Sequence, residues 1–132
     1  MLGMDVPLTP IEAAFAAMPA AQLPALRQAR GVILAEADRL GVGPLTETLK
    51  WGQPAYLTQA SKSGTTIRLG LQDEVAALFV HCQTTIIEDA RQLYGGVATF
   101  CGNRSLLLDG DPRAAVHVIC AALTYHRRGK LP

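Results

Sequence analysis

Apolar residues in the first forty positions recur at helical spacing. Thr9 and Glu12 form the pattern of a capping box, in which two side chains satisfy free amides at a helix start, and Pro10 suits the first helical position. We therefore predict a short helix over residues 10–18. A second helix is predicted over residues 24–40, where apolar side chains at three- and four-residue spacing line one face. These helices should pack as a pair that covers other elements.

Beyond residue 44 the apolar period changes to that of β-strands. Residues 67–71 alternate between apolar and other side chains, which is typical of a strand with one face in the core. Residues 75–82 are apolar on both faces for most of their length, which suits a central strand. Gly102 and Asn103 tolerate positive φ and separate two apolar runs, so a hairpin is predicted across residues 97–108.

Two further helices are predicted in the second half of the chain. Thr85 and Glu88 repeat the capping-box pattern and should open a helix that ends at Gly95. Asp111 should cap a last helix, which is apolar nearly all round over residues 114–125 and should therefore lie deep against the sheet.

The order of these elements predicts an α+β fold. We expect an N-terminal helical pair, an antiparallel sheet of four or five strands, and a C-terminal helix packed on the sheet. No internal repeat or long linker divides the chain, so residues 1–132 should form a single domain.

Composition narrows the function classes. The chain has 132 residues, 49% of them hydrophobic, which is ample for one core. Its net charge of +1 gives no overall field to attract nucleic acid or an anionic membrane. The basic segment at residues 126–130 lies where cations stabilise a helix end, and no aromatic residues that would stack on bases alternate with its cations. We therefore expect no nucleic-acid partner and no membrane partner.

The cysteines and the absence of targeting signals predict a cytoplasmic, soluble protein. Cys82, Cys101 and Cys120 are an odd number without CxxC spacing, which fits reduced thiols better than disulfides. No segment approaches the roughly 20 apolar residues of a membrane span, and the N-terminus lacks the layout of a signal peptide.

The segment at residues 50–56 holds the only tryptophan of the chain. Trp51 and Tyr56 flank Gly52, which can adopt backbone angles closed to other residues, and Pro54, which lacks an amide donor. Gly52 and Pro54 together should bend a strand or place it at a sheet edge, and such a bend would bring the two aromatic rings near each other.

A bend of this kind predicts a small ligand-binding cleft. Trp51 and Tyr56 would be its walls, while Lys50 and Gln53 would orient a planar or anionic ligand. The alternative is that both rings are core or edge packing around an awkward turn and that Lys50 is merely solvated.

The octapeptide LKWGQPAY at residues 49–56 resembles the hallmark of the YdhG-like family, a group of small bacterial domains mostly of unknown function. A looser similarity extends over residues 44–128. The resemblance implies a compact α+β fold in which helices pack on an antiparallel sheet. Some family members are described as frataxin-like iron chaperones, so the resemblance also implies iron as a candidate cofactor.

The residues themselves assign no metal site. An iron chaperone needs convergent carboxylates, whereas Glu36 and Asp38 are two apart on a predicted helix and face different directions. His117 and Cys120 share a helix face and are candidate ligands for zinc or ferrous iron. Spacing alone is poor evidence for a metal site, because cysteine is often buried as a small apolar residue and a histidine in an apolar helix usually needs one hydrogen bond only.

Three functional hypotheses remain open. The first is a non-catalytic accessory domain that binds a small molecule or a protein through Lys50, Trp51, Gln53 and Tyr56. The second is a frataxin-like iron chaperone. The third is a small enzyme whose site is assembled only in the fold, since no catalytic motif is present and no catalytic residue is predicted. The Ala- and Leu-rich helices are compatible with a homo-oligomer.

Overall fold

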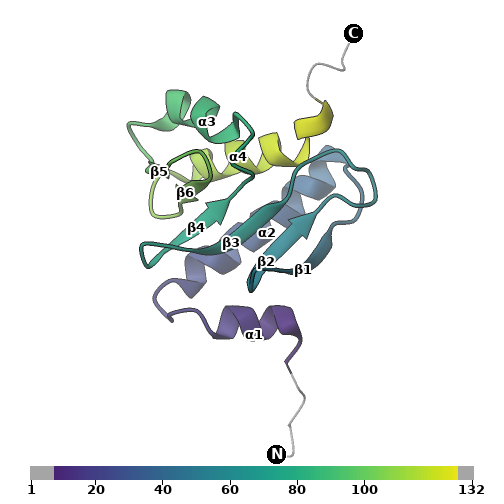
Figure 1. Cartoon of the computed structure of the whole chain (residues 1–132), viewed down its shortest axis with the longest axis vertical. Helices are drawn as coiled ribbons and strands as arrows, with labels where there is room; N and C mark the ends of the chain where they lie inside the picture. Colours follow the sequence, from purple (N-terminus) through teal and green to yellow (C-terminus); the bar gives the residue numbers. More distant parts are fainter. Residues whose placement is uncertain (1–7, 128–132) are drawn as a thin grey trace, which may run out of the picture.

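The computed structural model describes residues 8–127, which form a six-stranded antiparallel sheet with four α-helices (Figure 1). The strand order is β1-β2-β3-β4-β6-β5. The helices are α1 (Pro10–Ala16), α2 (Leu23–Leu40), α3 (Ile86–Tyr94) and α4 (Pro112–Leu123). The strands are β1 (Thr46–Lys50), β2 (Gln53–Leu57), β3 (Ile67–Gln72), β4 (Val75–Phe79), β5 (Phe100–Cys101) and β6 (Ser105–Leu107). The predicted α+β class is confirmed.

The N-terminal helices begin within one residue of the predicted starts, and α2 ends as predicted, but α1 ends at Ala16, two residues before the predicted end. The Thr9 hydroxyl accepts a hydrogen bond from the Glu12 amide at 3.1 Å and so caps α1. Gly41 ends α2 in the left-handed conformation, at φ 64°, which glycine adopts without steric cost. The apolar face of α2, with Leu26 and Ile33 fully buried, packs against the sheet and against α4.

The sheet has six strands because the bent segment around Gly52 is a complete hairpin. β1 and β2 pair from Thr46 with Leu57 to Lys50 with Gln53, so the turn contains only Trp51 and Gly52. Both turn residues have positive φ, as the twist of a two-residue hairpin requires. The prediction of four or five strands is too low because this segment was expected to form one bent strand.

The central strands divide the sheet into two faces. Ile67 and Leu69 of β3 and Leu78 of β4 are fully buried on the face covered by α2 and α4, which lie behind the sheet in Figure 1. Arg68, paired with Phe79, points to the opposite face, because successive strand residues alternate. We call this opposite side the open face. β4 lies between β3 and β6, which confirms its predicted central place.

The second capping box, predicted at Thr85, is not formed. Thr85 has φ −93° and ψ 8°, and its side chain makes no cap hydrogen bond. Its hydroxyl instead donates to the Asp89 carboxylate at 3.0 Å, because the Thr85 backbone is not in the extended conformation that aims a cap side chain at the helix amides. The helix α3 nevertheless occupies the expected residues.

The C-terminal helix closes the core. Asp111 caps α4 by accepting from the Arg113 amide at 2.9 Å. Val118, Ile119 and Leu123 are fully buried beneath α2 and α3. Residues 128–130 of the predicted basic segment lie outside the described residues. Between residues 8 and 127 no helix is both long and apolar enough to cross a membrane.

Gly64, in the loop between β2 and β3, lies against the C-terminal end of α4, and a substitution there tests how tightly the two segments pack. A Cβ at Gly64 would lie 2.2 Å from the Ala122 carbonyl oxygen, which is backbone and cannot move aside cheaply. We expect Gly64→Ala to lower the free energy of unfolding by about 2 kcal/mol, as overpacking does. Chemical denaturation measures the change.

The control is Gly31→Ala, because a Cβ at Gly31 of α2 meets no atom within 4 Å. A helical alanine there should raise the free energy of unfolding by up to about 1 kcal/mol. Equal effects of the two substitutions would contradict the tight packing of Gly64.

Candidate functional site

The four predicted ligand-binding residues lie in two separate environments. Tyr56 is 0% exposed on the helix-covered face, where it pairs with Ile67. Trp51 is 83% exposed at the tip of the β1–β2 hairpin, next to exposed Lys50. Gln53 lies on the open face, against Gly70. The prediction that Trp51 and Tyr56 wall one cleft is wrong, since the tight turn leaves Trp51 at the tip and sends Tyr56 into the core.

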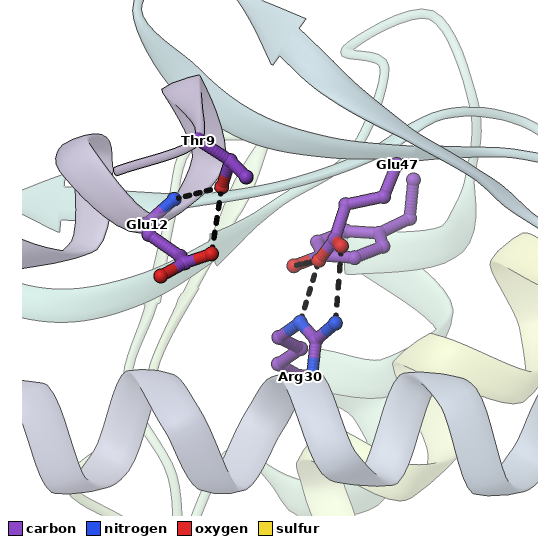
Figure 2. Close-up of polar contacts among 5 residues, drawn as sticks. Thr9, Glu12, Arg30 and Glu47 are labelled. Carbon is purple, nitrogen blue, oxygen red and sulfur yellow. Dashed lines mark hydrogen bonds and ion pairs between the residues drawn. The ribbon is translucent and has the colours of Figure 1, made fainter. Parts of the chain in front are cut away.

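Tyr56 belongs to a polar cluster that joins α2 to the β1–β2 hairpin. Its hydroxyl donates to Glu47 Oε2 at 2.7 Å. Arg30 of α2 donates to both oxygens of the same carboxylate, with Nη2 to Oε1 at 3.0 Å, and Figure 2 shows this two-point contact. The hydrogen bonds from Arg30 hold the pKa of Glu47 below its usual range. Burial raises the pKa of Tyr56, so its hydroxyl stays a donor.

An open cleft of about 660 Å³ lies between α1, α2 and β1. Arg30 and Glu47 stand on one side of it and Glu12 on the other (Figure 2). These charged groups are already engaged, because Arg30 binds Glu47 and the Glu12 carboxylate accepts from Thr9 at 3.1 Å. Arg27 lies over the Phe15 ring, 5.1 Å from its centroid. These contacts are made within the protein, and α1 is held on the sheet by its contacts with β1 and β2.

The open face carries a different cluster around Arg68. The guanidinium carbon lies 5.5 Å from the ring centroid of Trp51 and 5.3 Å from that of Phe79. Arg68 Nη1 donates to Gln53 Oε1 at 2.6 Å. We call Trp51, Gln53, Arg68 and Phe79 the Arg68 cluster. It brings together a hairpin tip, β2, β3 and β4.

Arg68 has no counter-ion in the part of the chain that the structure describes. Among residues 8–127 neither Arg68 nor Arg104 forms an ion pair with a carboxylate. Burial lowers the pKa of Arg68, and the positive charge of Arg104 lowers it further. Holding a partly desolvated cation without a counter-ion costs stability. Such uncompensated charges are found preferentially at functional sites.

Trp51 is also held in an unfavourable conformation. Its φ of 54° lies in the left-handed region, which a bulky side chain rarely adopts. Asn, Asp or Gly would satisfy the same turn at lower cost. A large, exposed aromatic residue kept in a strained turn is the kind of local exception that marks a binding or switching position.

The sequence identified part of this cluster. Trp51 and Gln53 are among the predicted site residues, whereas Arg68 and Phe79 are not. The alternation along β3 did place Arg68 on the non-core face, which was a usable signal. Phe79 lies in a run that is apolar on both faces, so nothing local indicates that its ring contacts an arginine.

The candidate soft metal ligands are engaged separately. The His117 ring packs on Tyr94, with centroids 5.6 Å apart. The Cys120 thiol donates to Glu36 at 2.9 Å, and burial raises its pKa to about 11. Within the described part of the chain, no three His, Cys, Asp or Glu side chains are grouped closely enough to hold a metal ion.

Comparisons of this chain with protein-family models, with curated proteins and with solved structures find no match. The Arg68 cluster is thus identified from its geometry and electrostatics.

Glu47→Gln tests the polar cluster beneath the hairpin. Because Arg30 depresses the pKa of Glu47 below its ordinary 4.5, the ionised carboxylate stabilises the folded state at higher pH, and this contribution is lost as the pH falls through the folded pKa. At pH 7 we expect the substitution to lower the free energy of unfolding by about 1–2 kcal/mol.

The difference between the two proteins should shrink in acid, when denaturation is measured at several pH values between 7 and 3. The control is Glu88→Gln, which removes an exposed carboxylate paired with Arg91 within α3 and should change stability by less than about 0.5 kcal/mol. A difference independent of pH would contradict the role of the Glu47 charge.

Proposed function

We propose that this protein is a non-catalytic binding domain that recognises a small molecule or a partner through the tip of its β1–β2 hairpin and the adjoining open face. Lys50, Trp51 and Gln53 supply the hairpin side of this surface, and Arg68 supplies its centre. Tyr56 takes a supporting role, because its hydroxyl anchors the hairpin from the other side of the sheet.

A single observation carries the proposal: an 83% exposed tryptophan with positive φ rests against an arginine that has no carboxylate partner among the described residues. Tryptophan and arginine are the residues most enriched at the energetic centres of binding interfaces. Both features cost stability in the isolated domain, and a ligand that covers them would repay that cost.

Recognition fits the chemistry of the Arg68 cluster better than catalysis. An indole, an amide, a guanidinium and a phenyl ring neither take up nor release a proton near neutral pH. The same groups stack, donate hydrogen bonds and attract negative charge. No specific observation favours the iron-chaperone role or the enzyme over this proposal. The resemblance of residues 49–56 to the YdhG-like hallmark is consistent with it, since those residues form the hairpin.

Tryptophan fluorescence tests the proposal directly. Trp51 is the only tryptophan, so intrinsic emission reports on the hairpin tip alone. We expect the free protein to emit as a solvent-exposed indole. Members of a panel of neutral, cationic and anionic metabolites that bind should shift or quench the emission in a saturable manner. An indole that already emits as a buried group, or one that no compound affects, would count against the surface.

The conformation of Trp51 predicts a trade between stability and binding. Trp51→Asn relieves the left-handed strain but loses the contact with Arg68, so the free energy of unfolding should stay within about 0.5 kcal/mol of the wild type or rise. The Trp51→Asn variant should no longer bind any panel ligand when binding is measured by calorimetry.

The matched control is Leu93→Ala, which removes an exposed apolar side chain from α3, away from the hairpin. This variant should bind as the wild type does. A Trp51→Asn protein that unfolds much more easily than the wild type would show that Trp51 is a structural residue instead.

A further inference from the structure

The chemistry of the open face specifies the ligand more closely, on the basis of the function proposed above. We propose that the ligand carries an oxyanion, a carboxylate or a phosphate, attached to a planar ring. Arg68 and Arg104 bind the oxyanion, and Trp51 stacks on the ring.

Arg68 has unused hydrogen-bonding capacity. A guanidinium presents five N–H donors in one plane, and a single one, on Nη1, is bound within residues 8–127, to Gln53. The ring faces of Trp51 and Phe79 contact the guanidinium without consuming its N–H groups. The remaining donors are therefore free for the two-point contact that arginine makes with carboxylates and phosphates.

Arg104 supplies a second cation close by. Phe79 pairs with Arg68 on one side and with Ser105 on the other, so Arg104, the turn residue before β6, is separated from β3 by β4 alone. Its charge is close enough to lower the pKa of Arg68. The amide of Val80, the residue after Phe79, donates to the Arg104 carbonyl at 2.8 Å. The Arg104 side chain makes no hydrogen bond or ion pair with any residue from 8 to 127. The two cations repel each other, and none of the described carboxylates pairs with either, so a bound anion would offset this repulsion.

Gly70 explains how Arg68 is held in place. A Cβ at Gly70 would lie 2.3 Å from Gln53 Nε2, so the missing side chain lets Gln53 lie flat on the sheet. From that position the Gln53 carbonyl oxygen accepts from Arg68. This contact orients a guanidinium that would otherwise extend into solvent, and preorganised donors bind anions better than mobile ones.

Trp51 accounts for the planar part of the ligand. Arg68 contacts the indole ring, yet the side chain remains 83% exposed, so much of its aromatic surface is free to stack. The two-residue turn restricts its backbone. A planar group that carries a negative charge would cover the indole while its oxyanion reaches Arg68.

The test is a titration of the full chain with four compounds. Binding is measured from the chemical shifts of the backbone amides and of the indole N–H. Phenyl phosphate and benzoate combine a ring with an oxyanion, inorganic phosphate has no ring, and benzyl alcohol has no charge. Both aryl oxyanions should bind at least about tenfold more tightly than inorganic phosphate or benzyl alcohol, which each lose one of the two contacts. The tighter of the two aryl compounds identifies phosphate or carboxylate as the preferred group.

Charge-removing variants locate the site. Arg68→Gln should weaken phenyl phosphate about tenfold, the loss expected for one charge-assisted pair, and Arg104→Gln should weaken it several-fold. Arg113→Gln removes an equal charge from α4, where Arg113 pairs with Asp111, and should leave the affinity within about twofold. Thermal unfolding shows whether each variant is folded, and Arg104, exposed in a turn, gives a second variant if Arg68→Gln does not fold.

The experiment distinguishes a failure of the oxyanion proposal from a failure of the proposed binding function. If benzyl alcohol binds as tightly as phenyl phosphate, or if Arg113→Gln matches the effect of Arg68→Gln, the oxyanion site is wrong. If none of the four compounds binds while another metabolite saturates the Trp51 emission, the ligand class is wrong and the binding function stands. If no compound of either set binds, both proposals fail.

Discussion

The hydrogen bond from the buried Tyr56 hydroxyl to Glu47 is the constraint on which the placement of the candidate site depends. A buried phenol needs an acceptor, and the carboxylate that accepts it needs Arg30 to offset its own burial. These requirements can be met in one pairing of β1 with β2. A slip by one residue would carry Tyr56 to the other face of the sheet and leave the carboxylate and the guanidinium without the phenol. Fixing the pairing also fixes which two residues form the turn, and it puts Trp51 at the tip.

The two faces of the sheet serve different purposes. The helix-covered face is packed with large aliphatic side chains that supply most of the hydrophobic stabilisation. The open face is built from small residues, among them Ala55, Gly70 and Ala77, of which both alanines are fully buried. Small residues leave room for Gln53 and Arg68 to lie along the sheet. The Arg68 charge is thus partly buried because the neighbouring side chains on the open face are small and the arginine can lie down on them.

Two features of this molecule work against its stability, and they are in contact. Trp51 occupies backbone angles that suit asparagine or glycine, and Arg68 keeps a partly desolvated charge beside the charge of Arg104. Other parts of the chain follow the local rules, since Thr9 and Asp111 cap their helices and Arg30 pairs with Glu47 beside the cleft. Lys62, Asp73 and Glu74 also have positive φ, so a strained turn residue is not unique to Trp51. Trp51 differs in that its exposed ring lies against a partly desolvated arginine.

The sequence alone determined those features that arise from contacts within a few residues. The cap at Thr9, the glycine end of α2 at Gly41 and the alternation of β3 each depend on interactions between near neighbours in the chain, so spacing and residue type predicted them. The tertiary structure decided everything that depends on pairing between distant segments. Whether residues 50–56 bend as one strand or turn back as two is settled by the buried partners of Tyr56, and the contact of Arg68 with Trp51 exists because β2 lies beside β3. Register is a long-range property, and no local pattern of apolar and polar residues encodes which ring an arginine seventeen positions away will meet.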